Sequence, residues 1–188
     1  MARYKREAKG KRINPTLFIF CEGESEETYI RYLRNKYRLP VEIVPRIMGN
    51  KISERIVREN LKYLTHHEKD RVFLMYDIDV EGFHAKLIEI QKKTDSVLLL
   101  SNPCFELWYI LHHCNQTSEI NTDNCIKKLE SLCPDYTKGT IPAKLREKLE
   151  TKSCDAIKKA KNLELHKNPS TNIYKFIEEL ESIKMGRV

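Results

Sequence analysis

The stretch Val72-Phe73-Leu74-Met75-Tyr76-Asp77-Ile78-Asp79 combines a short apolar run with two carboxylates. Five apolar residues, β-branched and aromatic types among them, are too few for a helix and are typical of a buried strand. Alternate residues of an extended chain point the same way, so we expect Asp77 and Asp79 to present their oxygens side by side past the strand. A cation such as Mg²⁺ between them would relieve their repulsion. The alternative is that both are ordinary turn or N-cap residues.

A second acid occupies the same kind of position earlier in the chain. Residues 16–21 form another short apolar run, and Glu22 follows it directly. A glycine turn and a helix are predicted next, with Ser25 as the helix cap and the following acids at the positive end of the helix dipole. Two separate segments therefore each end an apolar strand on a carboxylate.

The remaining apolar pattern alternates between strand and helix. Strands are predicted at 41–44 and 97–101, and amphipathic helices begin near Ile52 and Phe83. This order predicts an α/β fold with a mostly parallel four-stranded sheet flanked by helices. In such sheets functional groups gather at the carboxyl ends of the strands, so Glu22 and the Asp77/Asp79 pair are expected at one edge.

A third acid follows the strand at 97–101. We expect Asn102 to cap a helix and Pro103 to occupy its first position, which places Glu106 in the first helical turn near the same sheet edge. Glu106 is therefore a candidate member of the acidic site. A simple partner for the helix dipole, worth about 0.3 to 1 kcal/mol, explains it equally well.

Composition narrows the class of protein. The 188 residues are 40% hydrophobic, contain no stretch of 18 apolar residues, and begin without an apolar signal segment, which predicts a cytoplasmic protein without a membrane span. The six cysteines are scattered without a C-x-x-C pair, so neither a zinc cluster nor a disulfide framework is indicated, and most are expected to be buried thiols.

The positive charge is unevenly distributed. The net charge is +7, with six basic residues against one acid in residues 3–12 and eleven against six in residues 127–167. This pattern indicates a nucleic-acid partner, although soluble helices also carry solvated lysine faces. The candidate nucleic-acid contacts are Arg3, Lys5, Arg6, Lys11, Arg12, Lys144 and Arg146.

The chain divides into three predicted parts. Residues 1–15 form a basic arm, 16–121 an α/β core, and 122–188 a basic helical region packed on the core. In the last part, Asn168-Pro169-Ser170 is interpreted as a turn that starts the final helix.

The acids indicate a particular chemistry. Three or four carboxylates at one sheet edge, without cysteine or histidine ligands, form a hard-oxygen site that suits Mg²⁺ or Mn²⁺. Such an ion activates water and stabilises charge on a phosphate, so a basic surface beside it points to phosphodiester chemistry. The sequence contains neither a Walker loop nor a G-x-S-x-G elbow, which argues against an ATPase or an α/β-hydrolase.

An ordered set of motifs from about residue 16 to residue 180 resembles the RloB family. The motifs are Cys21-Glu22-Gly23 followed by Glu26, Glu27 and Tyr29; Tyr76-Asp77-Ile78-Asp79; Asn102-Pro103-Cys104-Phe105-Glu106-Leu107-Trp108; and Asn168-Pro169-Ser170-Thr171-Asn172-Ile173-Tyr174. The resemblance implies a Toprim-like fold, as in topoisomerases, primases and overcoming-lysogenization-defect nucleases, with Mg²⁺ bound by Glu22, Asp77 and Asp79. It also implies a nuclease component of bacterial phage defence, encoded beside an ATPase partner.

Other roles are less directly implied. Glu106 fits the family motif, and its part in the metal site is inferred from its position. Related nucleases also use a lysine, for which Lys138 is the candidate and Lys144 an alternative. A nuclease of this kind is expected to act on DNA or RNA, and tRNA is one candidate substrate.

Three functions compete at this point. The first is a metal-dependent nuclease under the control of the ATPase. The second is a non-catalytic adaptor that docks on nucleic acid or on the partner. A ligase, topoisomerase or primase subunit is disfavoured, because the sequence offers neither a tyrosine-bearing cleavage domain nor a zinc module.

Overall fold

A computed structural model describes residues 15–44, 51–62, 70–80 and 82–186. Five strands form one sheet in the order β2-β1-β3-β4-β5, and all neighbours are parallel except β4 and β5. The strands are β1 (Leu17–Cys21), β2 (Val41–Val44), β3 (Arg71–Asp77), β4 (Val97–Asn102) and β5 (Ser170–Thr171). The predicted α/β architecture and its four parallel strands are confirmed.

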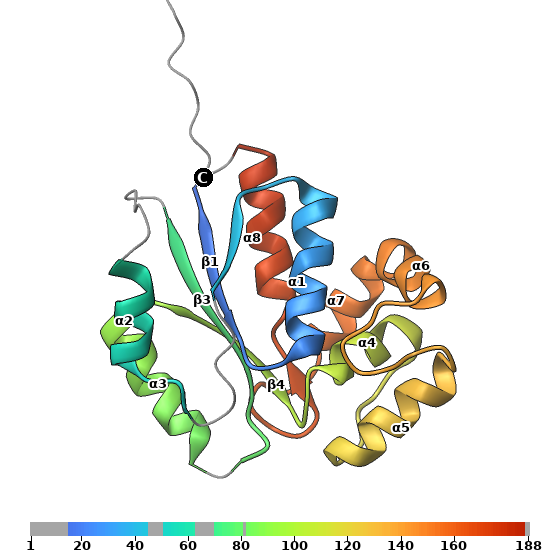
Figure 1. The fold of residues 1–188 in the computed structure, drawn as a ribbon. Coiled ribbons are helices and arrows are strands. Elements are labelled where there is room, and N and C mark those ends of the chain that lie inside the picture. Colours follow the sequence, from blue (N-terminus) through green and yellow to red (C-terminus); the bar gives the residue numbers. More distant parts are fainter. Residues whose placement is uncertain (1–14, 45–50, 63–69, 81, 187–188) are drawn as a thin grey trace, which may run out of the picture.

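The helices cover the two faces of the sheet unequally (Figure 1). They are α1 (Glu24–Tyr37), α2 (Glu54–Lys62), α3 (Phe83–Thr94), α4 (Glu106–His113), α5 (Thr122–Leu132), α6 (Ala143–Thr151), α7 (Ser153–Lys161) and α8 (Tyr174–Lys184). Helices α2 and α3 pack on one face, and α1 and α8 pack on the other, where α4 to α7 extend the same core. No helix within the described ranges is long and apolar enough to cross a membrane.

Alternation along the strands divides the core between the two faces. Ile19 and Met75 belong to the larger cluster with α1, α4 and α8, whereas Phe20 and Leu74 belong to the cluster with α2 and α3. Both faces of β1 and β3 are therefore buried, as expected for central parallel strands. The helical region after residue 122 contributes to the larger cluster through residues such as Leu129 and Phe176.

The fifth strand corrects the predicted count of four. β5 pairs antiparallel with β4, and Asn172 then holds β4 through its side chain: Nδ2 donates to the Leu98 carbonyl at 3.1 Å, and Oδ1 accepts from the Leu100 N–H at 2.6 Å. The segment is short and polar, so it lacks the apolar run that identified the other strands.

Two predicted helix starts are also wrong. Asn102 does not cap a helix, because it pairs with Ser170 as the last residue of β4, and α4 begins only at Glu106. Asn168 does not start the final helix, because its side chain bonds the backbone N–H and carbonyl of Ile120, and α8 begins at Tyr174. In both cases tertiary hydrogen bonds replaced the local capping geometry.

The prediction that most cysteines are buried thiols is confirmed. All six cysteines lie in the described ranges and are free thiols, and four of them are buried in the larger core cluster: Cys21, Cys104, Cys125 and Cys133. They behave as small hydrophobic side chains, and none belongs to the acidic site described next.

Candidate metal centre

Glu22 leaves the carboxyl end of β1 and is attached to the neighbouring strand. Its backbone N–H donates to the Met75 carbonyl at 3.1 Å, and its Oε2 accepts from the Asp77 N–H at 2.8 Å. Both bonds cross from β1 to β3 because these strands are parallel neighbours in the sheet. The Glu22 carboxylate is therefore held at the end of β3, beside the first acid of the predicted pair.

Glu26 enters the site from the first turn of α1. Its side chain is only 4% exposed, and it shares a helical stripe with the buried residues Tyr29, Ile30 and Leu33. The turn before the helix makes room for it, because a Cβ at Gly23 would lie 3.0 Å from Oε2 of Glu26. The packing of α1 on the sheet thus directs a carboxylate inward.

Glu22, Glu26 and Asp77 form the acid cluster. One oxygen from each lies within 4.8 Å of the others. Glu22 and Glu26 come from the end of β1 and the first turn of α1, and Asp77 comes from the end of β3, about 50 residues later in the chain. The convergence expected for Glu22 and Asp77 is what the structure shows.

Repulsion and burial shift the pKa values of all three acids upward. Burial raises the pKa of Glu26 to about 7, and the charges of Glu106 and Glu22 add to the shift. The pKa of Asp77 is raised well above its usual range by burial and then by Glu26 and Glu22. Burial also raises the pKa of Glu22, although the Asp77 N–H opposes that shift. A divalent cation would reverse these shifts by supplying opposite charge.

Glu106 lies behind the acid cluster, 2% exposed, at the start of α4. Its Oε1 accepts hydrogen bonds from the Ser25 hydroxyl at 2.7 Å and from the Tyr136 hydroxyl at 2.9 Å. Ser25 was predicted to cap α1, and this is wrong: the helix begins at Glu24, and the Ser25 hydroxyl points to Glu106 instead. Glu106 therefore ties α1, α4 and the segment after α5 together beside the acids.

Lys138 lies in the loop that follows Tyr136. Its side chain is exposed, and its positive charge partly offsets the rise in the pKa values of Glu22 and Glu26. The loop is attached to α1, since the Gly139 N–H donates to the Ser25 hydroxyl at 3.3 Å and the Gly139 carbonyl accepts from the Thr28 hydroxyl at 2.8 Å. The structure thus brings the predicted lysine to the acid cluster, and its catalytic role stays a prediction.

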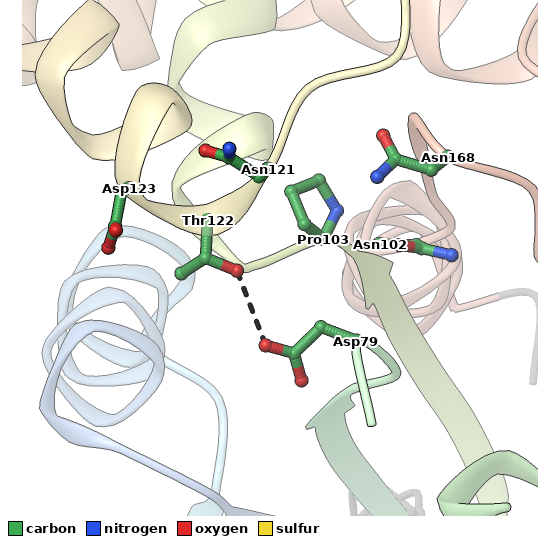
Figure 2. A pocket seen from close by; sticks show the side chains of 7 residues that line it. All are labelled: Asp79, Asn102, Pro103, Asn121, Thr122, Asp123 and Asn168. Atoms are coloured by element: carbon green, nitrogen blue, oxygen red, sulfur yellow. Dashed lines mark hydrogen bonds between the residues drawn. The ribbon is translucent and has the colours of Figure 1, made fainter. Parts of the chain in front are cut away.

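Asp79 is placed differently from its predicted partner Asp77. β3 ends at Asp77, so strand alternation does not extend to Asp79, and the exposed Asp79 carboxylate accepts from the Thr122 hydroxyl at 3.2 Å (Figure 2). Its charge still raises the pKa of Glu22 and Asp77. Glu26 occupies the place in the acid cluster that was expected for Asp79.

Asp79 also lines a pocket of about 380 Å³ at the same sheet edge. Figure 2 shows its other walls, which come from the end of β4, the start of α5 and the turn before β5: Asn102, Pro103, Asn121, Thr122, Asp123 and Asn168. The pocket is rich in amide and carboxylate groups, and none of the described residues that line it is a lysine or an arginine.

The predicted nucleic-acid contacts divide into two groups. Lys144 and Arg146 are exposed on α6, on the side of the molecule where α1 lies, and Arg146 lines a groove against α1. Those of the N-terminal arm lie outside the described residues: Arg3, Lys5, Arg6, Lys11 and Arg12.

The donor set fits Mg²⁺ or Mn²⁺. Both ions prefer carboxylate oxygens at about 2.1 Å, and the oxygens around one octahedral ion lie about 3 to 4 Å apart. The three oxygens of the acid cluster lie within 4.8 Å of one another, and no cysteine or histidine of the described residues belongs to the cluster. Glu22, Glu26 and Asp77 are the residues that would hold the ion, with Asp79 nearby.

Sequence reasoning did not include Glu26 among the site residues. The acids after Glu22 were assigned to the helix dipole, yet Glu26 falls on the stripe of α1 that carries Tyr29, Ile30 and Leu33. An acid at a core position of an amphipathic helix is a signal of function, because a buried carboxylate needs a partner.

Comparison with known proteins gave one result. A family model described as RloB-like protein matches residues 17–180, which covers most of the chain. No curated protein and no solved structure matches. The match contains β1, β3, α4 and β5, and with them every residue of the acid cluster. The chain therefore belongs to the RloB-like protein family.

Proposed function

We propose that the protein is a Mg²⁺- or Mn²⁺-dependent nuclease with a Toprim-like core, acting in phage defence with an ATPase partner. The acid cluster is the observation that carries the proposal, because three carboxylates with raised pKa values, none in an ion pair with a described residue, are costly unless a cation binds them. The defence role and the partner follow from what the family resemblance implies.

The residues of the chain have distinct parts in this proposal. Glu22, Glu26 and Asp77 hold the ion, which when bound supplies activation of a water molecule and stabilisation of phosphate charge. Lys138, at the open side of the cluster, is suited to bind a substrate phosphate oxygen. Glu106 positions α1 and the Lys138 loop through Ser25 and Tyr136.

Cleavage assays test the proposal directly. Single- and double-stranded DNA, RNA and tRNA are incubated with the protein in Mg²⁺, in Mn²⁺ and in EDTA, with and without the ATPase partner and ATP. We expect metal-dependent cleavage that Asp77→Ala abolishes, because this change removes one of three metal ligands.

Lys92→Ala provides the control, since Lys92 is exposed on α3 on the other face of the sheet. Cleavage by Asp77→Ala at the wild-type rate would exclude the acid cluster as the active site. Metal binding without cleavage of any substrate, even with the partner present, would favour the adaptor function.

A further inference from the structure

A basic groove of about 470 Å³ lies between α1 and α6. Arg31 and Lys36 from α1 and Arg146 from α6 supply three positive charges, against one negative charge from Glu150. Thr28, Tyr32 and Asn35 add a hydroxyl, a phenol and an amide to the lining. The groove therefore offers cations and hydrogen-bond donors together, which is the combination that binds phosphodiesters.

The cations of the groove are available to a ligand. Arg31 pairs with Glu27 at 2.6 Å, but its side chain is 53% exposed, and exposed ion pairs are worth at most about 1 kcal/mol. The Lys36 ammonium lies 5.8 Å from the Tyr32 ring, and Arg146 is exposed on α6. A phosphate can therefore replace or join these contacts at little cost.

Tyr32 provides a second, independent indication of a ligand. Its hydroxyl is buried and has no hydrogen-bond partner among the described residues, although the residue lines the groove. Leaving a buried hydroxyl unpaired costs about 1 to 3 kcal/mol. The hydroxyl is closed off from solvent, so the Tyr32 side chain must shift before a phosphate oxygen in the groove can accept this hydrogen bond.

The groove lies beside the loop that carries Lys138. Thr28 lines the groove and donates to the Gly139 carbonyl, so the groove wall adjoins the Lys138 loop. That loop lies closely on α1, because Gly139 has φ +80° and a Cβ there would lie 2.9 Å from Cβ of Glu24. Thr28 and Glu26 lie two residues apart on α1, about 3 Å along its axis but on different faces of the helix, so a strand in the groove would reach the acid cluster past the Lys138 loop.

We propose that this groove binds the phosphate backbone of a single nucleic-acid strand and guides it to the metal centre. The inference rests on the proposed nuclease function and adds that the substrate is single-stranded where it binds. A recess of this size admits a flexible strand, whereas a duplex is a stiff cylinder whose phosphates lie on its convex surface. The groove thus favours single-stranded segments, including loops of folded RNA.

Fluorescence anisotropy in EDTA tests this binding without cleavage. Labelled single-stranded DNA and RNA and a duplex of matched length are titrated with the wild type, Arg31→Glu/Arg146→Glu, Tyr32→Phe and the control Arg55→Glu/Arg58→Glu. The control has the same change in net charge, and its arginines are exposed on α2, on the opposite face of the sheet. Thermal melts confirm that each variant is folded.

We expect the groove double variant to bind single strands about tenfold or more weakly, and the slope of log affinity against log salt to fall by about 1.4, because two phosphate contacts are lost. Tyr32→Phe is expected to weaken binding by about two- to tenfold, the effect of one hydrogen bond. The control should keep wild-type affinity for single strands.

Equal losses of affinity in the two double variants would contradict the assignment of binding to the groove, since they would show a non-specific effect of net charge. Tighter wild-type binding to the duplex than to the single strand would contradict the preference for single strands. If neither nucleic acid bound at low salt, both the groove as a binding site and this preference would be wrong. Metal-dependent cleavage is measured separately in Mg²⁺, so its presence or absence decides the nuclease proposal independently of this result.

Discussion

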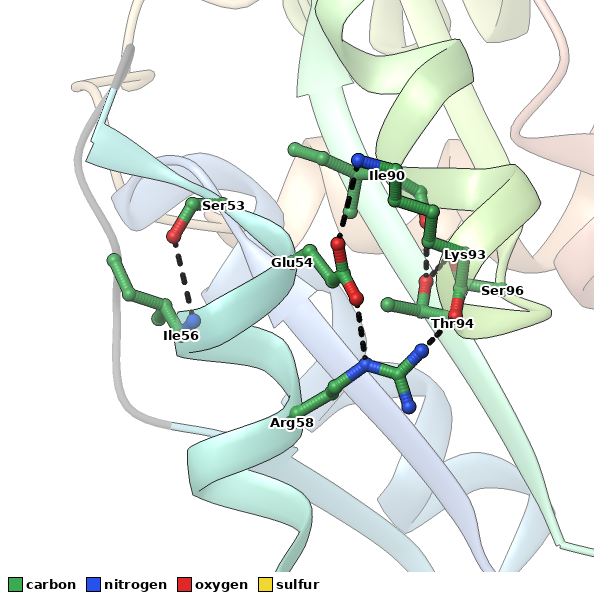
Figure 3. A network of polar contacts seen from close by, with 8 residues as sticks. All are labelled: Ser53, Glu54, Ile56, Arg58, Ile90, Lys93, Thr94 and Ser96. Atoms are coloured by element: carbon green, nitrogen blue, oxygen red, sulfur yellow. Dashed lines mark hydrogen bonds and ion pairs between the residues drawn. The ribbon is translucent and has the colours of Figure 1, made fainter.

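Carboxylates in two regions of the molecule have opposite electrostatic environments, and their pKa values shift in opposite directions. On the surface between α2 and α3, Glu54 accepts from the Arg58 side chain at 2.9 Å and pairs with Lys93 at 3.4 Å, while Arg58 also bonds the Lys93 carbonyl (Figure 3). The hydrogen bond from Arg58 lowers the pKa of Glu54. In the acid cluster, burial and neighbouring acids raise the pKa values of Glu26 and Asp77.

The difference separates a structural role from a functional one. Glu54 is neutralised by two cations of the chain itself, so its charge needs nothing further. Among the described residues, Lys138 is the cation that acts on Glu22 and Glu26, and the three acids of the cluster repel one another. Charge that the fold leaves uncompensated marks the place where an external cation is expected.

The largest expected effect is on the pH dependence of stability. The pKa of Glu26 is about 7 in the folded protein and 4.5 ordinarily. Below pH 4.5 the carboxyl is therefore protonated in both the folded and the unfolded state, and it does not reduce the free energy of unfolding. As pH rises from 4.5 to 7, the unfolded chain releases its proton first, and the stability of the metal-free protein falls. We expect Glu26→Gln to remove about 3 kcal/mol of that loss, because one pKa unit corresponds to about 1.4 kcal/mol.

Urea unfolding in EDTA at pH 4.5 and pH 8 measures this difference. Glu54→Gln, the same isosteric change at the exposed region, is the matched control and should not raise stability at pH 8. Wild-type and Glu26→Gln proteins that lose stability equally between the two pH values would contradict the repulsion assigned to the acid cluster.

Metal addition is expected to have an effect of similar or slightly smaller size. At a free Mg²⁺ or Mn²⁺ concentration about 100 times the Kd, binding to the folded state alone stabilises it by about 2.7 kcal/mol. Thermal melts with and without metal should show an increase in Tm for the wild type and for Glu54→Gln. The increase should be absent from Asp77→Ala, and its persistence in that variant would place the metal elsewhere.

The smallest effect is expected at the exposed network. Glu54→Gln removes two contacts to cations, but both partners are exposed, so we expect a slight fall in Tm that disappears at high salt. Melts at low and high ionic strength measure it. A fall in Tm larger than the change caused by Glu26→Gln would remove the contrast between the two regions.

Much of the fold could be predicted from the local spacing of apolar residues in the sequence. The four parallel strands follow from short apolar runs, and the amphipathic helices between them follow from apolar spacing. Two strands that end on Glu22 and Asp77 were enough to predict acids at one sheet edge, because parallel strands end together. β5 was missed because Ser170 and Thr171 are polar and pair with β4 from about 70 residues away.

The sequence by itself determined that β1 and β3 end on acids and that the next helix carries an acid on its apolar stripe. Only the tertiary structure decided which carboxylates meet. The position of Glu26 depends on how α1 packs on the sheet, and that of Asp79 on where β3 stops and on its bond to Thr122. The sequence pattern could not predict these two positions, because they depend on contacts between different elements of the fold. Periodicity indicates only which face of a single element is buried.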